Sequence, residues 1–160
     1  MVDFTKPSKS HLMTYHIGRG EQGVLTFEPY KSYLLPHWRF RTVTIARESS
    51  QILWGDFLEF YESHDFVGMD MSRKFIQMGM TRSKRYANYK GGRKYIDGKE
   101  KGIKNERSQG HDGKKEKEEA SRIFREVWER CKGHEGYHEM KKEFQKEQKE
   151  WVESESKTGA

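Results

Sequence analysis

Two long segments in the first half of the chain carry a helical pattern, and this pattern constrains the fold more than any other feature. Across residues 44–63, apolar side chains recur with the 3.6-residue period of an α-helix. The pattern resumes across residues 66–89 and is followed by Gly91-Gly92, a pair that typically ends a helix. The sequence therefore predicts two long helices that follow one another closely.

The rest of the chain completes the prediction of a compact, mainly α-helical single domain over residues 1–160. Residues 115–132 and 134–155 predict two further helices, which are polar and have sparse apolar anchors. Residues 1–10 resemble a loose tail, and residues 97–113 a glycine-rich charged loop. Residues 24–27 are the candidate for a minor β element near the N-terminus. Residues 30–38, interrupted by Pro36, predict a short helix or a turn.

The composition limits the class of protein. Hydrophobic residues make up 32% and charged residues 35% of the chain, so a few aromatic side chains, 13% of all residues, must supply much of the core. No apolar run is long enough for a signal peptide or a membrane span, and we expect a cytoplasmic protein. The single Cys131 excludes an internal disulfide and a cysteine-based metal cage. The histidines lack metal-ligand spacing and the chain has no GxGxxG motif, so we expect neither a metal nor a nucleotide cofactor.

One acidic pair lies where a helix of this kind should be apolar. At about 100° per residue, Asp56 falls between Ile52 and Phe60 on the face that should turn toward the core. Glu59, three residues further on, lies at the edge of the same face. A carboxylate in that position is costly unless it is paired or the face lines a cavity.

Two interpretations of this acidic pair remain open. In the structural one, Arg82 or Arg85 on the next helix satisfies the carboxylates in the interior. In the functional one, Asp56 and Glu59 face a pocket, where they hold a cationic substrate group or take a proton.

A basic segment follows directly. Residues 70–94 contain eight Lys/Arg against one acid, a net charge of +7, whereas residues 114–160 contain twelve of each sign. Cations interleaved with tyrosines suit RNA, because cations contact phosphates and aromatic rings stack on bases. A solvated helix face with core tyrosines is the alternative. The residues predicted to bind RNA are Arg73, Lys74, Arg82, Lys84, Arg85, Tyr86, Tyr89, Arg93 and Lys94.

Several strings in this region resemble a known family. They are the sequences WRFRT at 38–42, DFVGMDMSRKF at 65–75, RYAN at 85–88 and GGRKY at 91–95. They are similar to a widespread family of domains of unknown function, whose fungal branch contains the arginine-containing cyclodipeptide synthases. The similarity covers residues 24–95, and Tyr89 stands where the family pattern has histidine.

This resemblance implies an aminoacyltransferase that makes a cyclo(Arg-Xaa) diketopiperazine from arginyl-tRNA and a second aminoacyl-tRNA. It also implies that an Asp-x-x-Glu motif is important, which here is Asp56-Phe57-Leu58-Glu59. One carboxylate would bind the arginine guanidinium and the other would act as general base. The alternatives are a non-enzymatic RNA-binding helical module and a helical interaction protein.

Overall fold

In the computed structural model, the described residues are 5–89 and 113–158. They form six α-helices and one 3-10 helix, with no β-strand in these two ranges. The elements are α1 (Lys9–Leu12), α2 (Tyr30–Leu34), η1 (Leu35–His37), α3 (Val43–Glu62), α4 (Phe66–Asn88), α5 (Lys114–Gly133) and α6 (Glu135–Thr158).

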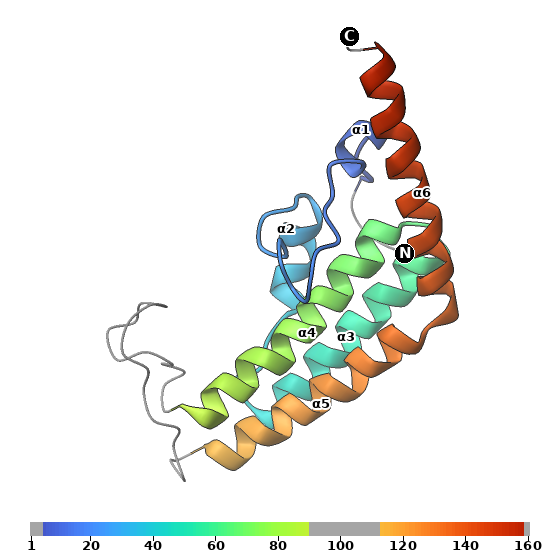
Figure 1. Cartoon of the computed structure of the whole chain (residues 1–160). Helices are drawn as coiled ribbons and strands as arrows, with labels where there is room; N and C mark the ends of the chain where they lie inside the picture. The colour runs from blue at the N-terminus through green and yellow to red at the C-terminus, as the bar shows by residue number, and fades with distance from the viewer. Residues whose placement is uncertain (1–4, 90–112, 159–160) are drawn as a thin grey trace, which may run out of the picture.

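Helices α3, α4 and α5 form a three-helix bundle in which each helix packs against the other two (Figure 1). Their shared core is rich in aromatic and methionine side chains, among them Phe57, Phe75 and Phe124, which are fully buried. Gly79 allows α4 to approach α5 closely, because a Cβ there would lie 2.5 Å from the Phe124 ring. A few large side chains thus supply much of the buried apolar area, as the composition predicts.

The N-terminal segment and α6 cover one end of this bundle. Helix α6 continues beyond α5 and passes beside α1, as Figure 1 shows. The Gln148 amide of α6 donates hydrogen bonds to the carbonyls of Met13 and Tyr15, at 3.1 and 2.7 Å. Short α2 and η1 connect this end to α3 and pack against α4 and α3.

The mainly α-helical class predicted from the sequence is confirmed, and the four long helices lie within a few residues of their predicted bounds. The prediction of a minor β element at residues 24–27 is wrong. Instead, Gly23 at φ +81° starts a turn, and the Thr26 amide donates to the Gly23 carbonyl at 3.2 Å. A strand needs a partner strand for its backbone groups, and the described residues supply none. Residues 9 and 10, predicted as part of a loose tail, begin α1 instead.

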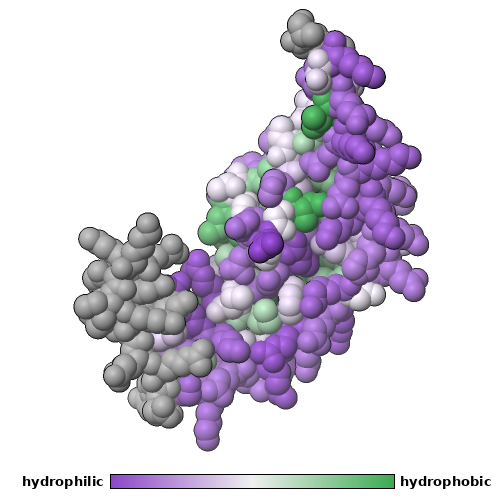
Figure 2. All heavy atoms as spheres, in the orientation of Figure 1, coloured by the Kyte–Doolittle hydropathy of each residue, from purple (hydrophilic) through white to green (hydrophobic). Residues whose placement is uncertain are grey.

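The exposed surface agrees with the polar composition. The face in Figure 2 is mostly hydrophilic, with apolar residues in small separate areas. Ile52, predicted for the core face of α3, is 49% exposed. No helix in the described part of the chain combines the length and the apolar character needed to cross a membrane.

Candidate functional site

Asp56 lies on the buried face of α3, as its position in the helical pattern predicts, and is 6% exposed. Its partner is a histidine: the Nδ1 atom of His37 lies 2.7 Å from Asp56 Oδ2. Asp56 pairs with neither Arg82 nor Arg85, so the structural interpretation with these two arginines is wrong. A second hydrogen bond reaches Asp56 from Tyr33. The Tyr33 ring also packs edge-on against His37, with ring centroids 5.3 Å apart.

The turn before α3 fixes His37 in this position. Pro36 lies within η1, and His37 is the last residue of that turn. The Ser49 hydroxyl of α3 donates to the His37 carbonyl at 2.5 Å and accepts the Arg39 amide at 2.9 Å. Ser49 therefore holds the backbone on both sides of His37 against α3. It lies seven residues before Asp56 on the same helix.

The electrostatics of this pair follow from its partial burial. Burial raises the pKa of Asp56 above its usual range, the hydrogen bond and charge of His37 oppose this rise, and nearby Glu59 adds to it. When Asp56 is ionised, its oxygen accepts the Nδ1–H of His37 and leaves Nε2 as the basic atom of the ring. Because the His37 side chain is 29% exposed, the pair combines a buried carboxylate with an accessible imidazole. This is the arrangement that general acid–base catalysis needs.

His37 lines a pocket of about 200 Å³ at the surface, together with Arg39, Ile45, Glu48, Ser49 and Ile52. We call it the His37 pocket. Glu48 is its carboxylate and Arg39 its arginine, so it presents both charges beside the imidazole. Glu59 is half-buried on α3, one turn beyond Asp56, and does not line this pocket.

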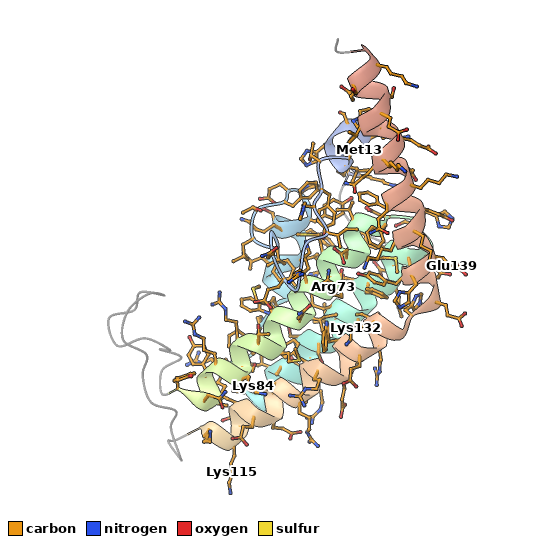
Figure 3. All side chains as sticks on the ribbon, viewed as in Figure 1. Met13, Arg73, Lys84, Lys115, Lys132 and Glu139 are labelled. Atoms are coloured by element: carbon orange, nitrogen blue, oxygen red, sulfur yellow. The ribbon has the colours of Figure 1, made fainter. Side chains whose placement is uncertain are left out.

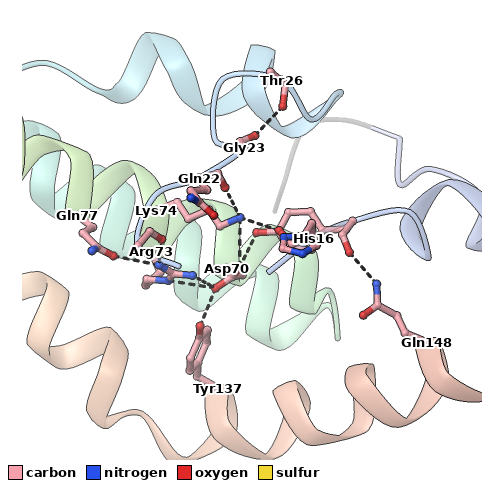
Figure 4. Close-up of polar contacts among 12 residues, drawn as sticks. His16, Gln22, Gly23, Thr26, Asp70, Arg73, Lys74, Gln77, Tyr137 and Gln148 are labelled. Carbon is pink, nitrogen blue, oxygen red and sulfur yellow. Dashed lines mark hydrogen bonds and ion pairs between the residues drawn. The ribbon is translucent and has the colours of Figure 1, made fainter. Parts of the chain in front are cut away.

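Two cations predicted to bind RNA lie in the interior instead. Arg73 and Lys74 are 7% and 0% exposed, and both pair with the fully buried Asp70 (Figure 4). Lys74 also donates to the carbonyls of His16 and Gln22, at 2.9 and 2.7 Å.

Hydrogen bonds from two tyrosines and an arginine complete this cluster. The Tyr15 and Tyr137 hydroxyls donate to Asp70, and Arg73 donates to the Gly20 carbonyl. The cluster thus fastens the N-terminal segment and α6 to α4. Since their donors already serve protein acceptors, we do not retain Arg73 and Lys74 as phosphate contacts.

The other predicted RNA contacts lie in the last part of α4. Lys84 is exposed near the helix end, as Figure 3 shows, and Arg82 and Arg85 are half-buried. Tyr86 is 37% exposed, whereas Tyr89 is only 6% exposed and offers little ring surface for stacking. Arg93 and Lys94 lie outside the described residues.

His37 is the candidate site residue that the sequence analysis does not predict. It lies 19 residues before Asp56, and no periodic pattern links a turn to a helix face. One signal was available, because a buried carboxylate needs a partner and a histidine follows Pro36 just ahead of the same helix.

Comparison with known proteins gives a family for the chain. No curated protein and no solved structure shows significant similarity to it. A family model described as "Domain of unknown function (DUF4385)" matches residues 3–147, which include the helical bundle and the His37–Asp56 pair. The chain therefore belongs to the DUF4385 family.

Proposed function

We propose that this protein is a tRNA-dependent aminoacyltransferase that forms an arginine-containing cyclodipeptide. The observation that carries the proposal is the buried Asp56 carboxylate paired with the accessible His37 imidazole, beside a pocket that contains an arginine and a glutamate. The basic end of α4 and the implications of the sequence resemblance supply the substrate class.

The reaction matches what this pair can supply. An aminoacyl-tRNA ester is already activated, so amide formation needs a base for the attacking α-amine and a proton for the departing ribose oxygen. His37 Nε2 takes the proton from the amine, and Asp56 stabilises the resulting imidazolium. The same proton then passes to the ribose oxygen. The free α-amine of the tRNA-bound dipeptide then attacks the remaining ester. His37 passes the amine proton to the second ribose oxygen, the ring closes and the second tRNA is released.

The carboxylate that holds arginine is better assigned to Glu48 than to Asp56. Asp56 is buried and already accepts hydrogen bonds from His37 and Tyr33, which leaves little room for a guanidinium. Glu48 is exposed in the His37 pocket and can accept two parallel hydrogen bonds from a guanidinium. Arg39, in the same pocket, carries a positive charge that suits the phosphates of the tRNA and not the arginine side chain.

The experiment is incubation of the purified protein with an aminoacyl-tRNA pool in which only arginine carries a heavy isotope. Mass spectrometry should detect a diketopiperazine with the arginine label. A matched pool with N-acetylated aminoacyl groups should give no product, because the attacking amine is blocked. The alternative, a non-enzymatic RNA-binding module, predicts that the protein binds tRNA and leaves its esters intact, which would overturn the proposed function.

A further inference from the structure

A second pocket lies next to the His37 pocket and has a different chemistry. It has a volume of about 580 Å³ and is lined by Arg39, Phe40, Arg41, Ile45, Tyr86 and Lys117. We call it the Tyr86 pocket. Arg39 and Ile45 line both pockets, so the two pockets are adjacent.

Aromatic rings form one wall of the Tyr86 pocket. The rings of Phe40 and Tyr86 have centroids 5.8 Å apart and are inclined at 53°, so they form a corner. Behind them, Trp38 packs against Phe40 at 5.1 Å and against buried Phe75 at 6.2 Å. The corner is therefore anchored to the core, while Tyr86 remains 37% exposed.

Three cations surround these rings, and none of the described residues that line the pocket is acidic. Lys117 of α5 lies 5.0 Å above the Phe40 ring and 5.6 Å above the Tyr86 ring, and donates to the carbonyls of Phe40 and Arg41 at 2.7 and 3.1 Å. Burial lowers the pKa of Lys117. Arg39 and Arg41 are exposed, and within the described part of the chain neither guanidinium has an ion-pair partner.

We infer that the Tyr86 pocket binds the 3′-terminal nucleotides of an RNA, with a base against the Tyr86 and Phe40 rings and phosphates on Arg39 and Arg41. Stacking rings combined with unpaired cations are the features that bind single-stranded RNA ends. A purely apolar ligand would leave the two guanidinium groups without a partner. A small free anion would make no stacking contact with the Phe40 and Tyr86 rings.

The position of the pocket selects the end of the RNA. This step rests on the proposed function: an aminoacyl ester is carried on the terminal ribose and must reach His37. Only the nucleotides next to that ribose can occupy a pocket that shares Arg39 and Ile45 with the His37 pocket. The inference thus joins residues from the turn before α3, the end of α4 and the start of α5 into one binding site.

The test compares the affinity of the protein for deacylated tRNA with a complete 3′ end and for the same tRNA without its terminal adenosine. Fluorescence anisotropy with labelled tRNA should show that the trimmed tRNA binds the wild-type protein about fivefold to a hundredfold more weakly, the range for one stacked base. Tyr86→Ala should bind both forms equally and weakly. Tyr86→Phe, which keeps the ring, should retain the difference, as should Lys146→Glu, a charge reversal on exposed α6.

Three outcomes overturn this inference. The wild-type protein could bind both tRNA forms equally, or Tyr86→Ala could retain the difference while its melting temperature is unchanged. AMP could also displace tRNA as well as a short RNA with the same 3′ end, which would make the ligand a free nucleotide. None of these measurements depends on product formation. A protein that distinguishes the two tRNAs but makes no diketopiperazine would keep the inference and lose the proposed function.

Discussion

At the scale of single residues, Asp56 and His37 differ in how far the sequence predicts them. The helical pattern alone places Asp56 on a buried face, and the structure confirms its burial. His37 could not be found in the same way, because its contact with Asp56 depends on how η1 folds back on α3 through Ser49. Tertiary contacts of this kind leave no periodic signal in the sequence.

For the basic residues of α4, in contrast, the sequence contains the signal that separates buried from exposed cations. Sequence reasoning grouped Arg73 and Lys74 with the later cations, although one acid in the segment, Asp70, lies only three and four residues before them. That spacing brings all three side chains to the same side of the helix. The buried cluster around Asp70 therefore follows from a spacing that was present in the sequence.

The buried Lys74 leads to a prediction about pH. Burial lowers the pKa of Lys74 to about 8 from 10.5, with the nearby Asp70 opposing this shift. Between these two values the unfolded chain binds a proton that the folded protein has lost, so stability should rise with pH.

The measurement is the free energy of unfolding from urea titrations at several pH values, for the wild-type protein and for Lys74→Met. We expect the difference, wild type minus variant, to increase by about 1 kcal/mol per pH unit between pH 8 and 10. Tyrosine ionisation is common to both proteins and largely cancels. A difference that stays constant or decreases would show that Lys74 is not a costly buried cation.

At the scale of elements, the long helices were predictable because each carries its own apolar period and its own end signals. Thr42 and Asp65 illustrate this, since each accepts a hydrogen bond from the third residue that follows it and so begins α3 or α4. Residues 24–27 were mispredicted because a short apolar stretch alone does not distinguish a strand from a turn. The exposed Ile52 shows that the buried face of α3 is rotated toward Ser50 and Phe57.

Two glycine-to-alanine substitutions test the packing of these helices. Gly79→Ala would place a Cβ 2.5 Å from the Phe124 ring and push α4 away from α5. Gly55→Ala has no atom within 4 Å of the new Cβ and replaces glycine in the middle of α3.

Thermal unfolding should therefore change in opposite directions for these two variants. We expect Gly79→Ala to cost about 1–3 kcal/mol of stability, a typical value for overpacking. Gly55→Ala should gain up to about 1 kcal/mol, because alanine favours the helix. Equal effects of the two substitutions would contradict the close contact between α4 and α5.

At the scale of the whole molecule, the charges are divided between two regions. The cations that remain accessible on α4 lie near its C-terminal end, whereas α6 mixes seven glutamates with five lysines along its length. If RNA binds at the end of α4, its affinity for the protein should fall steeply as salt rises, because bound cations release counterions from the phosphates.

The comparison is between two double charge reversals, Arg82→Glu with Lys84→Glu and Lys142→Glu with Lys146→Glu. Both alter the net charge equally, but only the first removes cations from the end of α4. The first should weaken tRNA binding and reduce the slope of log affinity against log salt by about one for each lost phosphate contact. Equal losses for the two double variants would show that binding depends on net charge alone.

The most direct test of the central claim is the rate of diketopiperazine formation by Asp56→Asn, measured together with tRNA affinity and melting temperature. Because burial raises the pKa of Asp56, a neutral amide should leave stability unchanged or higher. The rate should fall by about 10²–10⁴-fold, since His37 loses the carboxylate that orients it, while tRNA affinity stays at the wild-type value. Glu62→Gln, at the exposed end of α3, should be fully active. Product formation by Asp56→Asn at the wild-type rate would contradict the claim that the His37–Asp56 pair performs the chemistry.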